Sequence, residues 1–550
     1  MTGARYIAET LKGYGVTHVF YVEAILRRTM VEMEKLGIRR VLTHSEKAAA
    51  YMADGYARAG NRPAVCLAQS VGAANLAAGL QDGFLGHSPI LAITGRKPPL
   101  YQYRNAYQEI LHNTMFEAVT KYNVEVDDIK QLPHLLLQAF REATTGTPAP
   151  VHLDFLGYEG DLTDLAEAEL DVVVEHRYTS CPPHRPVPEE DAIEAAKEML
   201  LEAERPVIVV GRGAIVSGAG EEVRTLAEKL SIPVVSSMDG KGAIPDDHPL
   251  YIGPVGTYCV PCANRIVSEA DLVFFIGCGA GDQVTKNWTL PPIGTKVVQL
   301  DINPSETGRN YPGTTPLVGD AKTTLNRIIG TIQTDKKRIG WSKRARDLRK
   351  QYELAVEPQY NSDAVPIRPE RLCREISEAL PDDAVVLSDT GYSAIWAGSL
   401  IRITSPHQLF LRASGSLGWA FPAGLGAKCA FPGRPVVCFS GDGAFWYHLQ
   451  EIETAVRWDI PTVTVINNNS ILGQCQIGIR RSYGDERGRE TDQYRFMDTN
   501  FAKIAEDMGA LGIRVKNPDE VGNAIRLALE SNRPAVVDVV TEPESFPILT

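Results

Sequence analysis

"RPVVCFSGDGAFWYHLQEIETAVRWDIPTVTVINNNSILG", residues 434–473, contains two short apolar runs that each end in small or polar residues. The first run ends at Gly441, Asp442 and Gly443, and the second ends at three asparagines, of which Asn469 stands 27 positions after Asp442. The apolar residues between the two runs recur at helical spacing. We therefore predict a strand, a helix and a second, parallel strand, a unit that returns the chain to the same edge of a sheet. Asp442 and Asn469 are then expected to be neighbours in space.

The rest of the chain repeats this alternation. Runs rich in valine and isoleucine, such as "RPAVCLAQS", "RPVIVVGRG" and "ADLVFFIGCG", are separated by segments of helical period. The pattern predicts an α/β fold with doubly wound, mainly parallel sheets. The 550 residues are too many for one core, and residues 160–190 and 334–368 are polar and proline-containing, as linkers are, with the second part helical. We predict three domains, at residues 1–165, 188–335 and 366–550.

The first and third domains contain a distant internal repeat. "NRPAVCLAQS" near the N-terminus resembles "GRPVVCFSGD" in the opening stretch. The proline that leads each of these strands is followed 26 positions later by the proline that leads the next, at Pro63 and Pro89 and again at Pro435 and Pro461. A helix of small residues precedes each strand. The two domains are therefore predicted to be copies of one unit, placed around a different middle domain.

Asp442 and Asn469 together indicate a site for a hard cation. Magnesium binds carboxylate, amide and main-chain carbonyl oxygens and completes its shell with phosphate oxygens and water. Asp442, the side chain of Asn469 and the carbonyl of Ile471 would suit a magnesium–diphosphate site, and Gly441 and Gly443 would let the backbone approach a ligand. The alternative is that the glycines form a tight turn and the asparagines a loop.

At this point the sequence resembles the thiamine-diphosphate-dependent enzymes of the acetolactate synthase, benzoylformate decarboxylase and pyruvate oxidase superfamily, and acetolactate synthases in particular. The resemblance includes the spacing of "GDG" and "NN" and extends through "THSEKAAAYMADGYARAG", "GKGAIPDDHPLYIG", "LDINPSETGRN" and "GSLGWAFPAGLGA". It implies thiamine diphosphate and Mg²⁺ as cofactors. It also implies that the first domain binds the pyrimidine ring and the third domain binds the diphosphate.

The resemblance assigns a catalytic role to Glu46. In the family a glutamate at this place hydrogen-bonds the aminopyrimidine and favours the tautomer that takes the proton from the thiazolium ring. As an alternative, Thr43 and Glu46 fit a capping box at the start of a helix. The coincidence with Asp442, Asn469 and the internal repeat favours the catalytic interpretation, because a cap has no reason to accompany them.

Five further residues match cofactor-binding positions of the family. Leu417 matches the bulky apolar residue that supports the bent cofactor, and the carbonyl of Gly415 matches the one that binds its exocyclic amine. Gly391, Tyr392 and Ser393 match the loop that donates hydrogen bonds to the diphosphate. The alternatives are an ordinary core leucine and ordinary turn residues.

The sequence departs from the family where substrates are selected. "VFYVEAILRR" replaces a glycine-rich segment of acetolactate synthases and places Val22 or Glu23 near the substrate, while Gln474 stands where a methionine is expected. "AYQE" does match the family's "FQE", so Gln108 is a candidate to hydrogen-bond the acceptor or the intermediate; its alternative is a polar residue at a dimer interface. The identity of the substrate is therefore not carried over.

The resemblance also bears on FAD and on assembly. The Gly-rich turns "VGRGAIVSGAG" and "GCGAGDQVTKNW" of the middle domain could bind an ADP moiety. However, synthases that keep FAD usually carry "RFDDR" where this chain has "GAGDQVTKN", which argues against FAD. In relatives opposite subunits bind the two ends of the cofactor, so Glu46 of one chain would serve Asp442 of another. This implies a homodimer as the smallest active unit, and a homotetramer is common in the family.

We therefore predict a thiamine diphosphate and magnesium dependent enzyme that decarboxylates a small 2-oxo acid, such as pyruvate, and ligates the product to a second carbonyl. The alternatives are a lyase or hydrolase that cleaves a 2-hydroxy or 1,2-dicarbonyl compound, and a non-catalytic cofactor-binding scaffold. A net charge of -12 and a pI near 5.5 argue against nucleic-acid or anionic-membrane partners. The sequence has no secretory signal pattern and no stretch of 18 apolar residues, so we expect a soluble, cytoplasmic protein.

Overall fold

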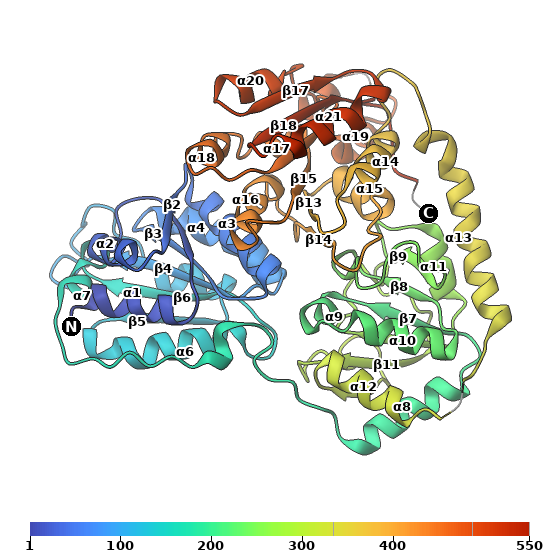
Figure 1. Cartoon of the computed structure of the whole chain (residues 1–550), viewed down its shortest axis with the longest axis horizontal. Coiled ribbons are helices and arrows are strands. Elements are labelled where there is room, and N and C mark those ends of the chain that lie inside the picture. The colour runs from blue at the N-terminus through green and yellow to red at the C-terminus, as the bar shows by residue number, and fades with distance from the viewer. Residues whose placement is uncertain (334, 487, 549–550) are drawn as a thin grey trace.

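The computed structural model describes residues 1–333, 335–486 and 488–548. Within these residues the chain forms three six-stranded sheets, and the strand pairs within each sheet are parallel. The three sheets belong to three bodies: the first is blue to turquoise in Figure 1, the second green to yellow, and the third orange to red. The predicted α/β class with doubly wound parallel sheets is confirmed. The strands of each sheet come from one predicted domain range, while the boundaries themselves stay a prediction.

The first sheet has the strand order β2-β1-β3-β4-β6-β5. Its strands are β1 (His18–Tyr21), β2 (Arg39–Leu42), β3 (Ala64–Gln69), β4 (Ile90–Arg96), β5 (Tyr122–Val126) and β6 (Val151–Leu156). The α-helices of this part are α1 (Gly3–Gly13), α2 (Arg27–Lys35), α3 (Glu46–Gly60), α4 (Gly72–Leu85), α5 (His112–Phe116), α6 (Leu132–Thr144) and α7 (Asp161–Leu165). Val65 and Leu67 of β3 pack in the core that contains α1 and α6, whereas Cys66 and Ala68 pack against α3 and α4. Both faces are thus covered, which explains why the strand is apolar throughout.

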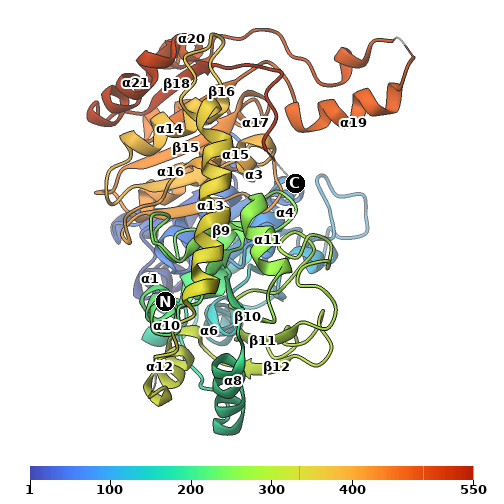
Figure 2. The ribbon, with the colours of Figure 1, turned by 90° about the vertical axis from the view of Figure 1, so that its right-hand side faces the viewer.

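The middle sheet has a different order, β12-β11-β10-β7-β8-β9. Its strands are β7 (Pro206–Val210), β8 (Val234–Ser236), β9 (Tyr251–Pro254), β10 (Leu272–Ile276), β11 (Lys296–Asp301) and β12 (Thr315–Val318). Its α-helices are α8 (Glu190–Glu202), α9 (Arg212–Ser217), α10 (Gly220–Leu230), α11 (Pro261–Ser268) and α12 (Ala321–Thr331). Long helix α13 (Ile339–Tyr360) then runs along the middle and third bodies (Figures 1 and 2), so the second predicted linker is part helix, as expected.

The third sheet has the order β14-β13-β15-β16-β18-β17. Its strands are β13 (Val385–Ser388), β14 (Leu409–Arg412), β15 (Val436–Gly441), β16 (Val463–Asn468), β17 (Leu511–Val515) and β18 (Ala535–Val540). Its α-helices are α14 (Pro369–Ala379), α15 (Tyr392–Leu400), α16 (Ala420–Ala430), α17 (Asp442–Phe445), α18 (Glu451–Arg457), α19 (Gly473–Tyr483), α20 (Phe501–Asp507) and α21 (Pro518–Glu530). Figure 2 shows α19 projecting from the body of the molecule.

The internal repeat is visible in the topology. Taken in chain order, the six strands of the first sheet and the six strands of the third are arranged identically, and β3 and β15 are the strands that the sequence repeat aligned. The equivalent helices α3 and α16 pack against each other and join the two domains through one shared apolar core. The first and third domains are therefore copies of one unit, as predicted.

The predicted single helix of the opening stretch is wrong in detail. The chain forms two short helices, α17 and α18, with a turn over residues 446–450 between them. The apolar spacing is nonetheless satisfied, because Phe445 and Ile452 are both buried in the core shared with the first domain. Burial of these side chains, rather than one continuous helix, explains the periodicity.

Candidate active site

Asp442 is the first residue of α17 and directly follows β15, at the end of the third sheet. Gly441 pairs with Asn467 in neighbouring β16, so the two strands end side by side. Asp442 is only 2% exposed, and burial raises the pKa of its carboxyl to about 7. The groups that lower this pKa most are backbone N–H groups, including those of Asn469 and Ser470, rather than a basic side chain. The negative charge of Asp442 is thus offset mainly by backbone N–H groups.

The three asparagines at the end of β16 have different surroundings. Asn467 accepts a hydrogen bond from the hydroxyl of the residue after β18, and Asn468 donates one to Asp538 at 2.8 Å. Both are therefore part of the sheet. Asn469 lies beyond the strand, where its side-chain oxygen accepts a hydrogen bond from the N–H of Ile471 at 3.3 Å. The backbone N–H of Asn469 lies against the carboxyl of Asp442.

The turn between β13 and α15 lies beside the same site. Gly391 precedes α15 with a φ of +93°, a conformation that glycine adopts without strain. Ser393 is buried, and its Oγ lies 3.1 Å from where a Cβ on Gly441 would be. The ring of Tyr392 lies 3.2 Å from the equivalent position on Gly473. The structure therefore brings the predicted diphosphate loop against the end of β15 and the start of α19.

Gly415 and Leu417 lie in the segment between β14 and α16. Gly415 is exposed, has a φ of +145° and has open space around it. Leu417 is partly exposed and belongs to none of the apolar clusters formed by the described residues. An ordinary core leucine would be part of such a cluster, so its position favours contact with a ligand.

Glu46 is the first residue of α3, and its carboxylate is partly exposed. A Cβ on Gly72 would lie 2.5 Å from its Oε1, and Asn75 donates a hydrogen bond to its Oε2 at 3.1 Å. The capping box is not formed, because the hydroxyl of Thr43 donates to main-chain carbonyls, one of them that of Ser45, and no side chain caps α3. The carboxylate of Glu46 is therefore available to a ligand.

One chain does not bring Glu46 together with the segment 414–417. The two lie at opposite ends of α3, because Arg58, near the C-terminal end of the helix, donates a hydrogen bond to the carbonyl of Arg412 at 2.8 Å. The 12 residues from Glu46 to Arg58 rise by about 18 Å along a helix. Within a single chain, Glu46 and the turn that carries Gly415 are therefore held apart along α3.

The residues predicted near the substrate are dispersed. Val22 and Glu23 follow β1, and exposed Glu23 forms an ion pair with Arg27 at 2.6 Å. Gln474 is exposed in the first turn of α19, with its Oε1 3.9 Å from where a Cβ on Gly391 would be. Gln108 has a φ of +62° in the segment between β4 and α5. Of these residues, the chain brings Gln474 alone beside the diphosphate loop.

A cavity of about 1360 Å³ lies where the middle domain meets the other two. Both Gly-rich turns of the middle domain line it, through Gly211 and Gly277 among others, and so do Gly391, Gly415 and Gln474. Arg412 also lines it and forms an ion pair with Asp239 at 2.8 Å. Sequence reasoning missed this pair, because neither residue lies in a motif.

The fold and the site define a class of protein: a thiamine-diphosphate-dependent enzyme. Family models for thiamine pyrophosphate enzymes match all three parts of the chain. The N-terminal TPP binding domain matches residues 1–115, the central domain residues 193–328, and the C-terminal TPP binding domain residues 389–539. In the described residues no helix is long and apolar enough to span a membrane.

Within this class the chain belongs to the acetolactate synthase-like family. It is 33% identical to the probable acetolactate synthase large subunit of Methanocaldococcus jannaschii over 100% of this chain and 93% of that protein. It is 30% identical to the acetolactate synthase isozyme 2 large subunit of Escherichia coli (98% and 95% covered) and 31% identical to the large subunit of Corynebacterium glutamicum (98% and 87%). The protein is a thiamine-diphosphate-dependent carboligase and decarboxylase, and the predicted family and enzyme class are confirmed.

Proposed function

We propose that this enzyme uses Mg²⁺ and thiamine diphosphate to decarboxylate a small 2-oxo acid, with pyruvate as the first candidate, and to ligate the product to a second carbonyl compound. The observation that carries this proposal is the site at the end of the third sheet, where buried Asp442 lies against the backbone N–H of Asn469, combined with the partly exposed carboxylate of Glu46. Relatives named acetolactate synthases support pyruvate as donor. They do not favour the lyase, hydrolase or scaffold alternatives.

The residues at this site fit a metal-bound diphosphate. A divalent cation would supply the positive charge that Asp442 lacks, and its ligands would be Asp442, Asn469 and the carbonyl of Ile471. Gly441 and Gly443 would allow the diphosphate to approach the backbone. The N–H groups of the turn at residues 391–393, at the start of α15, would bind the phosphate oxygens.

At the pyrimidine end the proposed roles belong to three residues. Glu46 would hydrogen-bond the ring and hold the proton that the ring exchanges, the carbonyl of Gly415 would accept a hydrogen bond from the exocyclic amine, and Leu417 would support the bent shape. Bound thiamine diphosphate supplies a nucleophilic carbon and an electron sink. The protein would therefore orient the cofactor, exclude water from the site and move a proton at Glu46.

The substrates would contact four residues outside the cofactor site. We assign this role to Val22, Glu23, Gln108 and Gln474, with Gln108 as the residue that hydrogen-bonds the acceptor or the intermediate. Gln474 is supported by its position next to Gly391. Because Val22, Glu23 and Gln108 come from the first domain, they would meet Gln474 across subunits.

A homodimer is the proposed smallest active unit, and a homotetramer would be an assembly of two such dimers. The separation of Glu46 from the 414–417 segment along α3 supports this, because a second chain would be needed to complete each site. FAD has no part in the proposed reaction, although the Gly-rich turns that line the large cavity could hold an ADP moiety. We place the enzyme in the cytoplasm, where 2-oxo acids are available to it.

The test is an NMR assay of the purified protein with Mg²⁺, thiamine diphosphate and a panel of pyruvate, 2-oxobutyrate, benzoylformate and glyoxylate. Formation of a 2-hydroxy ketone such as acetolactate is expected for the wild type, with a loss of at least about 100-fold for Glu46→Gln. Exposed Glu34, which pairs with Arg40, supplies the matched Glu34→Gln control, which should retain activity. Turnover by Glu46→Gln at the wild-type rate would overturn the mechanism, and consumption of none of the acids would overturn the substrate class.

A further inference from the structure

The internal repeat pairs two turns that bear on the cofactor. Superposing Pro63 on Pro435 places His44, two residues before Glu46, on Ser416. The same superposition places Asp82 of α4 on Thr454 of α18. The turn before α3 and the turn before α16 are thus equivalent, and so are the helices that carry Asp82 and Thr454.

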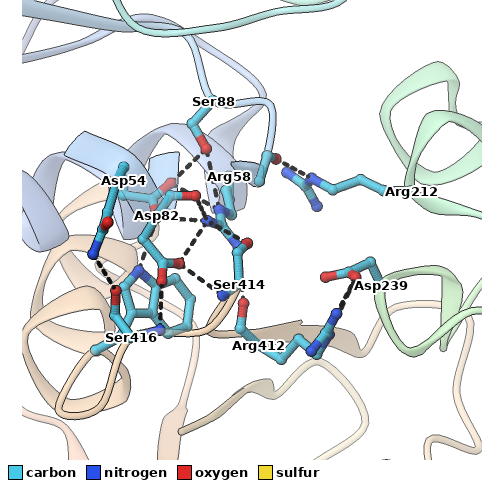
Figure 3. Close-up of polar contacts among 12 residues, drawn as sticks. Asp54, Arg58, Asp82, Ser88, Arg212, Asp239, Arg412, Ser414 and Ser416 are labelled. Atoms are coloured by element: carbon cyan, nitrogen blue, oxygen red, sulfur yellow. Dashed lines mark hydrogen bonds and ion pairs between the residues drawn. The ribbon is translucent and has the colours of Figure 1, made fainter. Parts of the chain in front are cut away.

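Asp82 of the first domain binds the turn of the third domain that carries Gly415. Asp82 is 1% exposed, its Oδ1 accepts a hydrogen bond from the N–H of Ser414 at 2.8 Å, and its Oδ2 accepts one from the N–H of Ser416 at 3.1 Å. One carboxylate therefore spans the two residues on either side of Gly415 (Figure 3). A carboxylate that receives two backbone N–H groups fixes the orientation of the peptide groups between them.

Glu451 of the third domain does the same for the turn of the first domain that carries Glu46. Glu451 is fully buried on α18, and its two side-chain oxygens lie 3.1 and 3.3 Å from the N–H of His44. The hydroxyl of Thr454 donates to the same carboxylate at 2.6 Å. Each domain therefore holds the equivalent turn of the other through a buried carboxylate.

Burial of either carboxylate carries a desolvation cost. Burial raises the pKa of Asp82 and of Glu451. Arg58, which is 2% exposed, offsets part of the cost for Asp82: its Nη2 lies 3.1 Å from Asp82 Oδ1 and 2.7 Å from Asp54 Oδ2 (Figure 3). Trp419, at the start of α16, donates to the same oxygen of Asp54 at 2.8 Å. Apolar side chains would fill this buried space at a lower free-energy cost, so the packing of the two domains does not by itself explain the charged residues.

We propose that Asp82 and Glu451 are positioning residues for catalysis that form a reciprocal clamp, in which each domain fixes the cofactor-binding turn of the other. Asp82 aligns the carbonyl of Gly415, and Glu451 aligns the carboxylate of Glu46. The clamp rests on the proposed function, since it acts through the roles given there to Glu46 and Gly415. Both residues would act through the backbone of these turns, to which their carboxylates are hydrogen-bonded.

Asparagine at position 82 keeps the size of the side chain and puts an NH₂ group against one of the two backbone N–H groups that Asp82 accepts. Glutamine at position 451 removes the charge and leaves one oxygen where the carboxylate offers two to the N–H of His44 and the hydroxyl of Thr454. Asp82→Asn should weaken binding of thiamine diphosphate by roughly 10-fold, since the carbonyl of Gly415 is no longer held. Glu451→Gln should slow hydrogen–deuterium exchange at C2 of the bound cofactor by roughly 10- to 100-fold with a smaller change in cofactor affinity, since Glu46 handles the proton.

Two matched controls are available. Glu453→Gln lies on the same helix, α18, and its carboxylate contacts the ring of His44 at 2.7 Å rather than its backbone. Asp164→Asn removes a buried carboxylate that accepts hydrogen bonds from the N–H groups of Arg28 and Thr29, both at 2.9 Å, away from the cofactor turns. Both controls should keep the wild-type cofactor affinity and the wild-type exchange rate.

The experiment measures cofactor affinity by titration with Mg²⁺ present and C2 exchange by quenched-flow NMR, on folded dimer for each variant. Where an amide variant does not accumulate, Asp82→Glu and Glu451→Asp keep the charge and displace the carboxylate by one methylene, and they should show the same pattern. Clamp variants that fold and match their controls in both measurements would overturn the clamp. A wild type that does not accelerate C2 exchange would instead overturn the proposed function.

Discussion

Asp442, Asp389 and Asp301 are carboxylates at or just beyond the ends of strands, and burial raises the pKa of each. Asp389 follows β13, is fully buried, and accepts hydrogen bonds from the N–H groups of Gly418 and Ala420 at 2.9 and 3.2 Å. Its pKa is raised to about 6. Asp389 therefore fixes the turn that follows Leu417 from within the third domain, whereas Asp82 binds the residues before Leu417 from the first domain. Carboxylates that cap turns order this site before any ligand binds.

Asp301, which lines the large cavity, should make the stability of the protein depend on pH. Burial raises its pKa to about 6, and its Oδ1 accepts the N–H of Asn303 at 2.9 Å, which an asparagine oxygen could also do. Because the folded state holds this proton more tightly than the unfolded chain, the contribution of Asp301 to stability falls as pH rises from about 4 through about 6. Relative to Asp301→Asn, the wild type should lose about 1 to 3 kcal/mol of unfolding free energy over this range. Denaturant titrations of both proteins at several pH values measure this loss. A difference in unfolding free energy that stays constant with pH would contradict a raised pKa of Asp301.

At the scale of elements, the crossing of α3 and α16 joins the two copies of the repeat. A Cβ on Gly55 would lie 1.9 Å from the carbonyl oxygen of Ala423, and a Cβ on Gly426 would lie 1.8 Å from that of Met52. The two contacts are reciprocal, because each glycine meets the carbonyl of the residue three positions before the other glycine. Glycine is needed at both positions because only a hydrogen atom fits between the helices.

Gly55→Ala and Gly426→Ala should each destabilise the protein by about 1 to 3 kcal/mol, because the helices must move apart. Gly330 of α12 is the matched control, since no atom lies within 4 Å of a Cβ there. Gly330→Ala should stabilise by about 0.5 to 1 kcal/mol, the ordinary effect of removing a helical glycine. Chemical denaturation of the three variants distinguishes steric overlap from helix propensity. Equal effects at the three sites would show that the crossing tolerates a methyl group.

Some of these elements and site residues could be predicted from the sequence, and others could not. Parallel strands are buried on both faces, so their apolar runs identified β3, β7, β10, β15 and β16 directly. Asp442 and Asn469 were found because their spacing matches a strand–helix–strand unit. Asp82 and Glu451 were missed, because each acts on a turn more than 300 residues away and an isolated acid on a helix usually faces solvent. The break between α17 and α18 was missed because both short helices keep one apolar period.

At the scale of the whole molecule, the arrangement of the three domains leaves each proposed cofactor site divided. The first and third domains of one chain meet through α3 and α16, and this contact puts Glu46 at one end of α3 and the Gly415 turn at the other. Two copies of the chain related by a two-fold axis could supply each other's missing half, as an isologous interface does for both partners at once. A dimer would then contain two equivalent sites.

Mixed dimers of two inactive variants test this division. Glu46→Gln and Asp442→Asn are each expected to be inactive alone. In a hybrid dimer one site would contain both substitutions, while the other would combine the unchanged Glu46 of one chain with the unchanged Asp442 of its partner. Random pairing makes half of the dimers hybrids with one working site each, so co-expression should restore about a quarter of the wild-type activity. Two Glu46→Gln chains with different tags are the control and should recover nothing. If Glu46 and Asp442 of one chain served the same site, every site in the mixture would carry a defect and no activity would return, so recovered turnover follows only from sites shared between chains.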